Sequence, residues 1–330
     1  MKKRILTGIT TTGTPHIGNY LGAIKPALEL AKNYDESFYF LADYHAIIKN
    51  SKNLEVSASV KDVALAWLAS GLDPNKSFFY RQSDIPEILE LSWILNCVTA
   101  KGLMNRSHAY KSATSLNTDD EDKGITMGLF SYPVLMAADI LMFNATHVPV
   151  GADQIQHIEM TRDIAGRFNH LYKKTFILPE AIIQSSKETV PGIDGQKMSK
   201  SYGNIIPLLS SEKQLKKSIA KIITNSLEPG DPKDHLNCTV FALYKYFASK
   251  PMIEEFKDDY INGISWGDAK NKLFEIINKD IEPVRNRYEE LLNDKDLIND
   301  LLSDGAKKVR PIAKEMIDSI RSSIGINKIS

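Results

Sequence analysis

The first two-thirds of the chain alternates short β-rich runs with longer stretches of helical periodicity, and this alternation limits the possible folds more than any other feature. The runs with strand character are residues 4–9, 36–43, 76–83, 146–151 and 173–183. Strands separated by helices favour parallel β-α-β crossovers, because two parallel strands need a long connection between them. The sequence therefore predicts an α/β fold: a doubly wound, Rossmann-type parallel sheet over residues 1–203, with its ligand site beyond the carboxyl ends of the strands.

After about residue 203 the β pattern stops and the remaining sequence is patterned as helix. We expect residues 204–330 to form an all-helical second domain, whose last helix can pack back on the first domain. In that last stretch Gly305 is expected to break the helix. The apolar residues that follow share one helical face: Val309, Ile312, Ala313, Met316 and Ile320.

Composition narrows the class of protein. The chain has 330 residues, 43% of them hydrophobic and 25% charged, as in ordinary globular proteins. Basic and acidic residues balance at 41 each, which argues against an overall basic coat but leaves a local basic face possible. The start lacks a secretory signal, and the longest apolar run, residues 132–143, is too short to cross a membrane. We therefore expect a cytoplasmic protein that does not associate with membranes.

The two cysteines, Cys97 and Cys238, lie far apart and form no CxxC pair. We expect them to be reduced, buried thiols that form neither a disulfide nor a zinc site. No dense acidic cluster built to hold a metal ion by itself is evident.

The segment TTTGTPHIGNYLGA, residues 10–23, leads from the first expected strand into a helix. A helix start exposes free N–H groups and the positive end of the helix dipole, which suits a phosphate. Gly13 and Gly18 lack side chains where a nucleotide would approach the backbone. His16 and Asn19 offer hydrogen-bond donors to phosphate or ribose. Taken alone, an ordinary capped core helix explains this segment equally well.

A second segment, DGQKMSKSYGN at residues 194–204, places Lys197 and Lys200 in a loop rich in Gly, Ser and Asp. Alone it is compatible with a solvated surface turn. Together, PHIGN near the start and KMSKS in this loop resemble the two nucleotide-binding motifs of class I aminoacyl-tRNA synthetases.

The chain between these motifs narrows the resemblance. Residues 131–169 resemble the substrate-binding region of the tryptophanyl-tRNA synthetase family over almost their whole length, and the stretches GNYLGA, KKSIAKIITNS and DGAKK are similar to that family too. The resemblance implies a tryptophan–tRNA ligase that uses ATP, with Mg²⁺ arriving on the ATP, to form tryptophanyl-adenylate and pyrophosphate. It then transfers tryptophan to the 3′ end of tRNA(Trp). A homodimer is also implied.

Residue roles follow from the same resemblance. It implies catalytic roles for His16, Lys197 and Lys200. It implies ATP contacts from Thr10, Thr11, Thr12, Gly18, Asn19, Lys111, Gly151, Ala152, Asp153, Val190, Lys197, Met198, Ser199, Lys200 and Ser201. The chain departs from the family pattern where Thr10 replaces a glutamine that would contact ATP and where Ala152 replaces a glutamate. The segment 105–111, which carries Lys111, differs from the commoner form as well.

Amino-acid selection is assigned to the segment from residue 132. Pro133 suits the first turn of a helix, and Tyr132, Met136 and Asp139 would then share one helical face. An unpaired buried carboxylate is costly, so Asp139 needs a partner. The residues alone are equally compatible with a backbone amide or a basic side chain as that partner.

The resemblance supplies a different partner for Asp139, the indole N–H of tryptophan. It also implies that Gln154 and Tyr132 hold the substrate's ammonium and carboxylate groups. His45, at a strand end, is a candidate to line the pocket. His157 is expected to be structural.

Three alternatives remain open. A tyrosyl-tRNA synthetase has related motifs, although the Met-Ala-Ala-Asp run at residues 136–139 favours tryptophan. A small-molecule adenylyltransferase would not need the long helical domain, and a non-catalytic synthetase-like tRNA-binding protein would be expected to lose one motif. Four lysines of the helical part are candidates for docking tRNA, although such a helix face is usually only solvated: Lys213, Lys216, Lys217 and Lys221.

Overall fold

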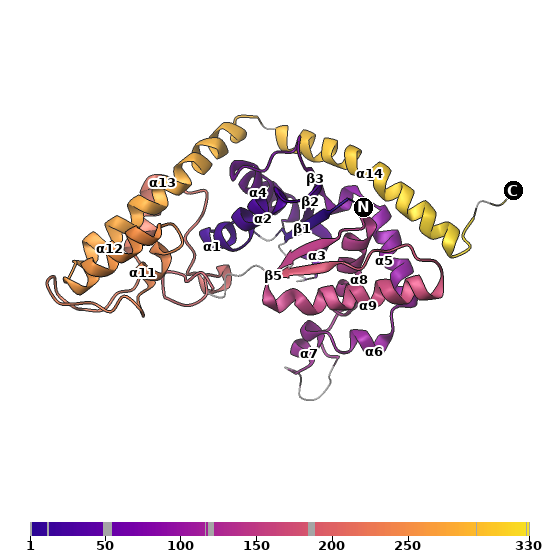
Figure 1. Ribbon diagram of the computed structural model, residues 1–330, viewed down its shortest axis with the longest axis horizontal. Helices are drawn as coiled ribbons and strands as arrows, with labels where there is room; N and C mark the ends of the chain where they lie inside the picture. Colours follow the sequence, from indigo (N-terminus) through magenta and orange to yellow (C-terminus); the bar gives the residue numbers. More distant parts are fainter. Residues whose placement is uncertain are drawn as a thin grey trace.

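The computed structural model describes residues 2–11, 13–48, 55–115, 117, 122–183, 189–294, 296–327 and 329. A five-stranded parallel sheet lies at its centre, in the strand order β3-β2-β1-β4-β5 (Figure 1). The strands are β1 (Arg4–Thr10), β2 (Glu36–Ala42), β3 (Phe78–Arg81), β4 (His147–Val150) and β5 (Glu180–Ile183). This confirms the predicted Rossmann-type α/β fold, although the last strand is much shorter than the run 173–183 suggested.

The order of the strands reverses beside β1. The chain moves outward from β1 to β2 and β3, then returns to the other side of β1 to form β4 and β5. All neighbours pair in parallel, so the carboxyl ends of the strands lie on one edge of the sheet. The crevice outside the carboxyl ends of β1 and β4 is therefore the place where an open α/β sheet binds its ligands.

Helices connect and cover the strands. Those of the sheet part are α1 (Ile17–Asn19), the π-helical turn η1 (Tyr20–Ile24), α2 (Lys25–Ala31), α3 (Asp43–Ile47), α4 (Val56–Ala69), the 3₁₀ turn η2 (Gln82–Asp84), α5 (Glu87–Val98), α6 (Lys101–Met104), α7 (His108–Thr114), α8 (Met127–Met142), the 3₁₀ turn η3 (Ala152–Gln154) and α9 (Ile155–Leu171). Beyond them follow the 3₁₀ turn η4 (Lys200–Tyr202), α10 (Glu212–Ala220), α11 (Thr239–Tyr244), α12 (Lys250–Ile261), α13 (Trp266–Leu292) and α14 (Leu297–Ser323).

The two faces of the sheet bury separate apolar clusters. On β2, Tyr39 and Leu41 pack with α4 and with the helices that follow residue 204, whereas Phe38 and Phe40 pack with α5, α8, α9 and α14. This alternation follows from the two-residue period of a strand. Both clusters include residues from the helical part, so the sheet depends on that part for its cover. Among the described residues no helix is long and apolar enough to cross a membrane.

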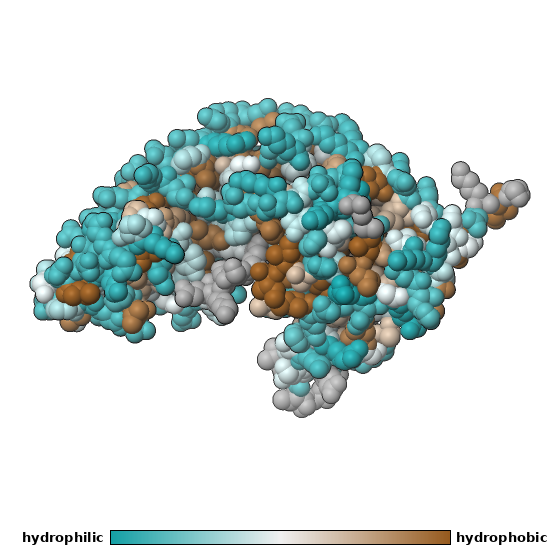
Figure 2. Space-filling model, in the orientation of Figure 1, coloured by the Kyte–Doolittle hydropathy of each residue, from teal (hydrophilic) through white to brown (hydrophobic). Residues whose placement is uncertain are grey.

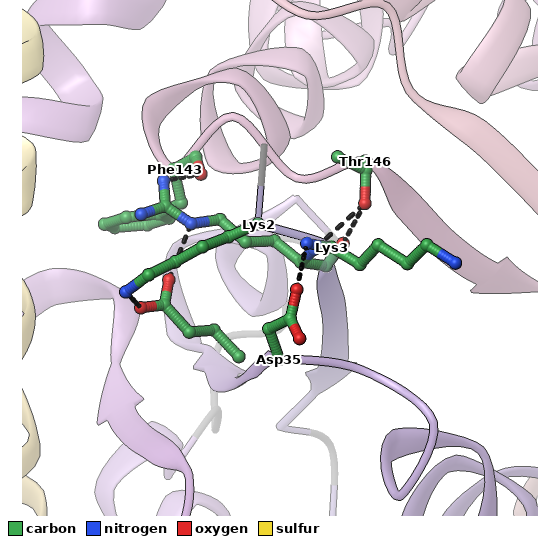
Figure 3. Close-up of polar contacts among 7 residues, drawn as sticks. Lys2, Lys3, Asp35, Phe143 and Thr146 are labelled. Carbon is green, nitrogen blue, oxygen red and sulfur yellow. Dashed lines mark hydrogen bonds and ion pairs between the residues drawn. The ribbon is translucent and has the colours of Figure 1, made fainter.

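The amino end of β1 is fixed by a set of polar contacts (Figure 3). The Arg4 guanidinium donates to Glu36 at 2.7 Å and to the Phe143 carbonyl at 2.8 Å. The backbone N–H of Arg4 donates to the Thr146 hydroxyl at 2.9 Å. These contacts tie β1 to the starts of both neighbouring strands, at the edge of the sheet opposite the ligand crevice.

Helix α13 runs away from the helical lobe, and α14 then packs along the sheet part (Figure 1). In Figure 1, α11, α12 and α13 form a lobe on the left, and α14 lies along the sheet part on the right. Buried residues of α14 belong to the same apolar cluster as Tyr80 of β3 and Leu91 of α5. The division at residue 203 stays a prediction. Figure 2 shows hydrophilic residues over most of the visible face, with apolar residues gathered around the edge strand β5.

Three local predictions were wrong. Pro133 lies inside α8, which begins at Met127 and is capped by Thr126, whose hydroxyl accepts the Leu129 N–H at 3.2 Å. Both cysteines are free thiols, but Cys97 is exposed and Cys238 half-buried. Gly305 also lies inside a helix, α14, instead of ending one.

Gly305 is required by packing. A Cβ built on it would lie 1.7 Å from the Phe79 carbonyl oxygen, so α14 crosses β3 where only a glycine fits. We expect Gly305→Ala to lower the free energy of unfolding by about 3 kcal/mol, because helix and strand must separate. Urea denaturation would measure this. The matched control is Gly166→Ala in α9, where a Cβ meets nothing within 4 Å and the change should be neutral or stabilising. Equal stability of the two variants would contradict the packing argument.

Candidate functional site

The segment after β1 forms the first half of the site. His16 has extended backbone geometry and stands immediately before α1. The Asn19 side-chain oxygen accepts the His16 backbone N–H at 3.0 Å, so it caps its own helix. Because the amide oxygen is used in this cap, the amide nitrogen is the group that Asn19 can offer to a ligand.

His16 is only 7% exposed, and its Nδ1 has no hydrogen-bond partner among the described residues. Burial, with the charge of Lys200 as a second cause, lowers the pKa of His16 to about 4. The imidazole is therefore neutral at neutral pH and interacts as a hydrogen-bonding group, not as a cation. A Cβ on Gly18 would lie 2.9 Å from His16 Nδ1, so the glycine makes room for this ring.

The lysine loop, residues 194–204, lies against the start of α1 and the turn before it. The Gly18 N–H lies 3.3 Å from the Met198 sulfur. Gly13 has φ +62°, and a Cβ there would lie 3.1 Å from the Lys200 Nζ. The structure thus brings together the two segments that the sequence singles out, from opposite ends of the sheet part.

The same turn also holds the chain that leaves the loop. The Ile17 N–H donates to the Ile206 carbonyl at 2.9 Å, and the Leu208 N–H donates to the Pro15 carbonyl at 3.3 Å. The lysine loop is therefore attached downstream to the turn that carries His16.

Asn204 organises the lysine loop from within. It is 2% exposed; its amide nitrogen donates to Asp194 at 2.7 Å and to the Lys197 carbonyl at 3.0 Å, and its oxygen accepts the Ser199 N–H at 2.8 Å. The Met198 N–H donates to the Val190 carbonyl at 2.9 Å. Asn204 ends the segment 194–204 but was not among the predicted site residues.

The other expected ATP residues divide by position. Thr10 ends β1 and is exposed, Thr11 is fully buried, and Thr12 lies outside the described residues. Lys111 is an exposed residue of α7, a helix that packs beside α8 and below α9 in Figure 1. Gly151, Ala152 and Asp153 follow β4 at the crevice, and all three are exposed. In the loop 194–204, the hydroxyl groups of Ser199 and Ser201 form a hydrogen bond of 2.8 Å.

A second set of polar residues surrounds Asp139 of α8. Asp139 is 0% exposed. Its carboxylate lies 2.9 Å from His45 Nε2 and accepts hydrogen bonds from Gln82 Nε2 at 2.8 and 3.0 Å. Burial raises the pKa of Asp139, and the hydrogen bonds from His45 and Gln82 oppose this shift. The result is a buried carboxylate whose partners are side chains from the carboxyl ends of β2 and β3.

Two members of this set were missed from the sequence. Gln82 and Asp43 directly follow β3 and β2, and both are buried. Polar residues that follow neighbouring parallel strands share an edge of the sheet, and this was the signal that could have identified them.

The remaining predicted pocket residues lie on α8, η3 and α9. The Tyr132 hydroxyl is 2.8 Å from His157 Nε2, and His157 is 4% exposed with a pKa lowered mainly by burial. The Gln154 amide donates to Asp153 at 3.2 Å. Met136 is half-buried on the same helix as Asp139. The contact with Tyr132 gives His157 a definite partner for its buried ring.

Comparison with known proteins agrees with this geometry. The family described as tRNA synthetases class I (W and Y) matches residues 1–281. A tryptophan–tRNA ligase of Neisseria meningitidis serogroup A is 53% identical over 333 residues, covering 99% of both chains. One from Pseudomonas aeruginosa is 52% identical over all of this chain and 75% of its own length.

Solved structures give the same result. The tryptophanyl-tRNA synthetase of Campylobacter jejuni, complexed with ADP and tryptophan, is 42% identical and superposes with a TM-score of 0.88, covering 98% of this chain and 99% of its own. The tyrosyl-tRNA synthetase of Archaeoglobus fulgidus, at 20% identity and a TM-score of 0.64, shares the fold. With both motifs assembled at one crevice and relatives of this similarity, the chain belongs to the class I tRNA synthetases of the tryptophan and tyrosine group.

Proposed function

We propose that this protein is a tryptophan–tRNA ligase, which activates L-tryptophan with ATP and transfers it to tRNA(Trp). The observation that carries the proposal is Asp139, a fully buried carboxylate at the sheet edge that also holds the assembled His16 and Lys200 segments. A buried acceptor suits the indole N–H, which is a donor only. The similar ligases of Neisseria and Pseudomonas and the tryptophan complex from Campylobacter support the same substrate.

The proposed chemistry needs no general base. The tryptophan carboxylate is already an anion; its oxygen attacks the α-phosphorus of ATP, and pyrophosphate leaves with the electron pair of the broken P–O bond. Catalysis then consists of positioning the two substrates and of placing cations near the developing phosphate charge. Lys197 and Lys200 supply the cations. Neutral His16 and the amide nitrogen of Asn19 supply hydrogen bonds, whereas the backbone N–H groups of Ile17 and Gly18 at the helix start already have partners within the chain.

Mg²⁺ is proposed to enter with the phosphates of ATP. Across the described ranges no group of three or more His, Cys, Asp or Glu side chains is placed to hold a metal ion. ATP phosphates themselves provide oxygen ligands of the kind Mg²⁺ prefers. The ATP contacts predicted from Thr10, Lys111 and Ala152 belong to the proposal.

Tryptophan-dependent exchange of label between pyrophosphate and ATP tests the activation step. We expect exchange with tryptophan and far less with tyrosine or phenylalanine. Preferred activation of tyrosine would assign the chain to the other branch of the family. Absence of exchange with all three amino acids would favour a non-catalytic tRNA-binding protein.

The tRNA is proposed to dock on the helical part. Three lysines are exposed here: Lys213 and Lys217 of α10, and Lys221, which follows the helix. Lys217 and Lys221 line an open groove of about 310 Å³ together with Ser210 and Gln214. Exposed lysines beside a groove suit a phosphate backbone.

Replacing those three lysines with alanine is expected to lower aminoacylation of tRNA(Trp) about tenfold or more, because each removes a phosphate contact whose free energy adds to the others. Pyrophosphate exchange should stay near wild type, since the lysines lie outside the nucleotide and tryptophan sites. The rates of aminoacylation and of pyrophosphate exchange, measured on the same protein preparations, test this expectation. Equal loss of both activities would contradict a tRNA-specific role.

A cytoplasmic homodimer completes the proposal. Leu89 and Trp93 lie one turn apart on α5, and they are 41% and 71% exposed; Met127, at the start of neighbouring α8, is 72% exposed. Exposed large apolar side chains on two helices that pack together favour a protein interface. Sedimentation equilibrium tests this, and a monomer at all concentrations would contradict it.

A further inference from the structure

Gln82 lies between the carboxylate of Asp139 and the backbone of α3. Its side-chain nitrogen is 2.8 and 3.0 Å from the two Asp139 oxygens. Its side-chain oxygen accepts the Tyr44 N–H at 3.2 Å. Because a backbone donor fixes the oxygen end of the amide, the NH₂ end has to face the carboxylate. Gln82 is therefore a donor with a defined orientation, and it is fully buried.

Asp43 fixes the surroundings of Gln82. One Asp43 oxygen accepts the N–H groups of Tyr44 and Ser83, at 3.0 and 3.1 Å, and the other accepts the Ser83 hydroxyl. The residues that follow β2 and β3 are thus tied together on both sides of Gln82. This arrangement leaves the amide little freedom to turn away from Asp139.

We propose that Gln82 is a positioning residue for amino-acid selection, which keeps Asp139 ionised and oriented as an acceptor for the substrate's indole N–H. The inference rests on the proposed function of Asp139. An ionised carboxylate has about four acceptor positions, so it can accept from His45, from Gln82 and from a ligand at once. A protonated carboxyl carries an O–H donor and keeps fewer acceptor positions, so it is a poorer partner for a group that only donates.

The charges around Asp139 show why such a donor is needed. The ionisable groups that face it are Asp43 and His45 of α3 and Tyr80 of β3. Burial raises the pKa of Asp139, and the negative charge of Asp43 raises it further. The contacts with His45 and Gln82 act in the opposite direction and lower the pKa of Asp139. Loss of the Gln82 donor would therefore raise the pKa of Asp139 and favour its protonated form.

The first test replaces Gln82 by methionine, which has a similar volume and no donor. The ligands are L-tryptophan and its analogue with sulfur in place of the indole N–H, β-(3-benzothienyl)alanine, and their affinities are measured from pH 5 to 8. We expect Gln82→Met to weaken tryptophan binding about tenfold or more at neutral pH and to move its acid-side loss to higher pH. Binding of the sulfur analogue should change by less than about twofold, since that ligand makes no hydrogen bond to Asp139.

Gln82→Glu is a second, independent variant that preserves the shape of the side chain. At low pH two adjacent carboxyl groups share one proton, so the introduced carboxyl can donate to Asp139 much as the native amide does. At higher pH both carboxyl groups are ionised and repel. This variant should therefore select tryptophan at low pH and lose that selection as pH rises, opposite in direction to Gln82→Met. The matched control is Tyr80→Phe on β3, the strand that precedes Gln82, which removes a buried hydroxyl with no hydrogen-bond partner in the described part of the chain.

The outcomes separate the two levels of the argument. A wild-type protein that does not activate tryptophan refutes the proposed function and, with it, this inference. If wild type selects tryptophan and Asp139→Ala abolishes selection, wild-type pH profiles in both Gln82 variants would overturn the inference and leave the proposed function standing. Equal weakening of both ligands by Gln82→Met would also overturn it, because it would show a purely structural role. If Gln82→Met does not fold, the pH profile of Gln82→Glu decides.

Discussion

Replacing Lys200 by alanine is expected to slow formation of tryptophanyl-adenylate by an amount on the order of 3 kcal/mol in activation free energy, while tryptophan binding stays nearly unchanged. Lys200 lies next to Gly13 on the turn before His16, where the phosphates of ATP are proposed to bind. A cation that meets charge developing in the transition state lowers the barrier more than it strengthens ground-state binding.

Pre-steady-state measurement of adenylate formation, together with equilibrium binding of tryptophan, separates these two effects. Lys32→Ala is the matched control, because Lys32 is an exposed lysine at the end of α2 that pairs with Glu29 at 2.7 Å. A near-wild-type rate in Lys200→Ala would contradict the assignment. A loss confined to tryptophan affinity would do so too.

Replacing Asp139 by alanine is expected to lower kcat/KM for tryptophan by about 2–4 kcal/mol and to cost phenylalanine far less. A site built to accept a substrate N–H rejects a ligand that lacks one, because an acceptor position of the buried carboxylate is then left unfilled. Phenylalanine offers no donor, and the tyrosine hydroxyl would project from a smaller ring at another point. The ratio of kcat/KM for tryptophan to kcat/KM for phenylalanine should therefore be smaller in the variant than in the wild type.

Exchange kinetics with tryptophan, tyrosine and phenylalanine, on wild type and variant, provide the measurement. Asp139→Asn is an informative companion, since it keeps one acceptor oxygen and should lose less selectivity than alanine. An unchanged ratio in Asp139→Ala would reduce Asp139 to a structural residue. In that case His45 and Gln82 would be its only partners of consequence.

The alternation of strands and helices predicted the sheet and its binding edge, because strand periodicity is a local property of sequence. The local conformational preferences of Pro133 and Gly305 predicted a helix start and a helix break, but these residues lie inside α8 and α14. At Gly305 tertiary contact decides, since a strand carbonyl approaches the helix too closely for any Cβ. Helix-breaking tendencies are modest energies, and packing of a long amphipathic helix exceeds them.

The candidate site was predicted less completely than the sheet. His16 and Lys200 could be singled out because each lies in a short recognisable segment. Of the residues around Asp139, His45 was predicted, but Gln82 and Asp43 were missed because nothing near Asp139 in the chain points to them. The available signal was that each of the two directly follows a strand. Their proximity depends on how neighbouring strands align, which a residue pattern along one strand does not specify.

The contact between Gly305 and Phe79 also has a consequence for protein synthesis. The helix that covers β3 begins more than two hundred residues after that strand. At roughly 10 residues per second, a ribosome needs on the order of 20 seconds to make the intervening chain. During that interval Tyr80 and its apolar neighbours lack the cover that Val309 and Ala313 later provide. The apolar face of the nascent sheet thus stays uncovered until α14 has been made, and completion of this cluster is a late folding step.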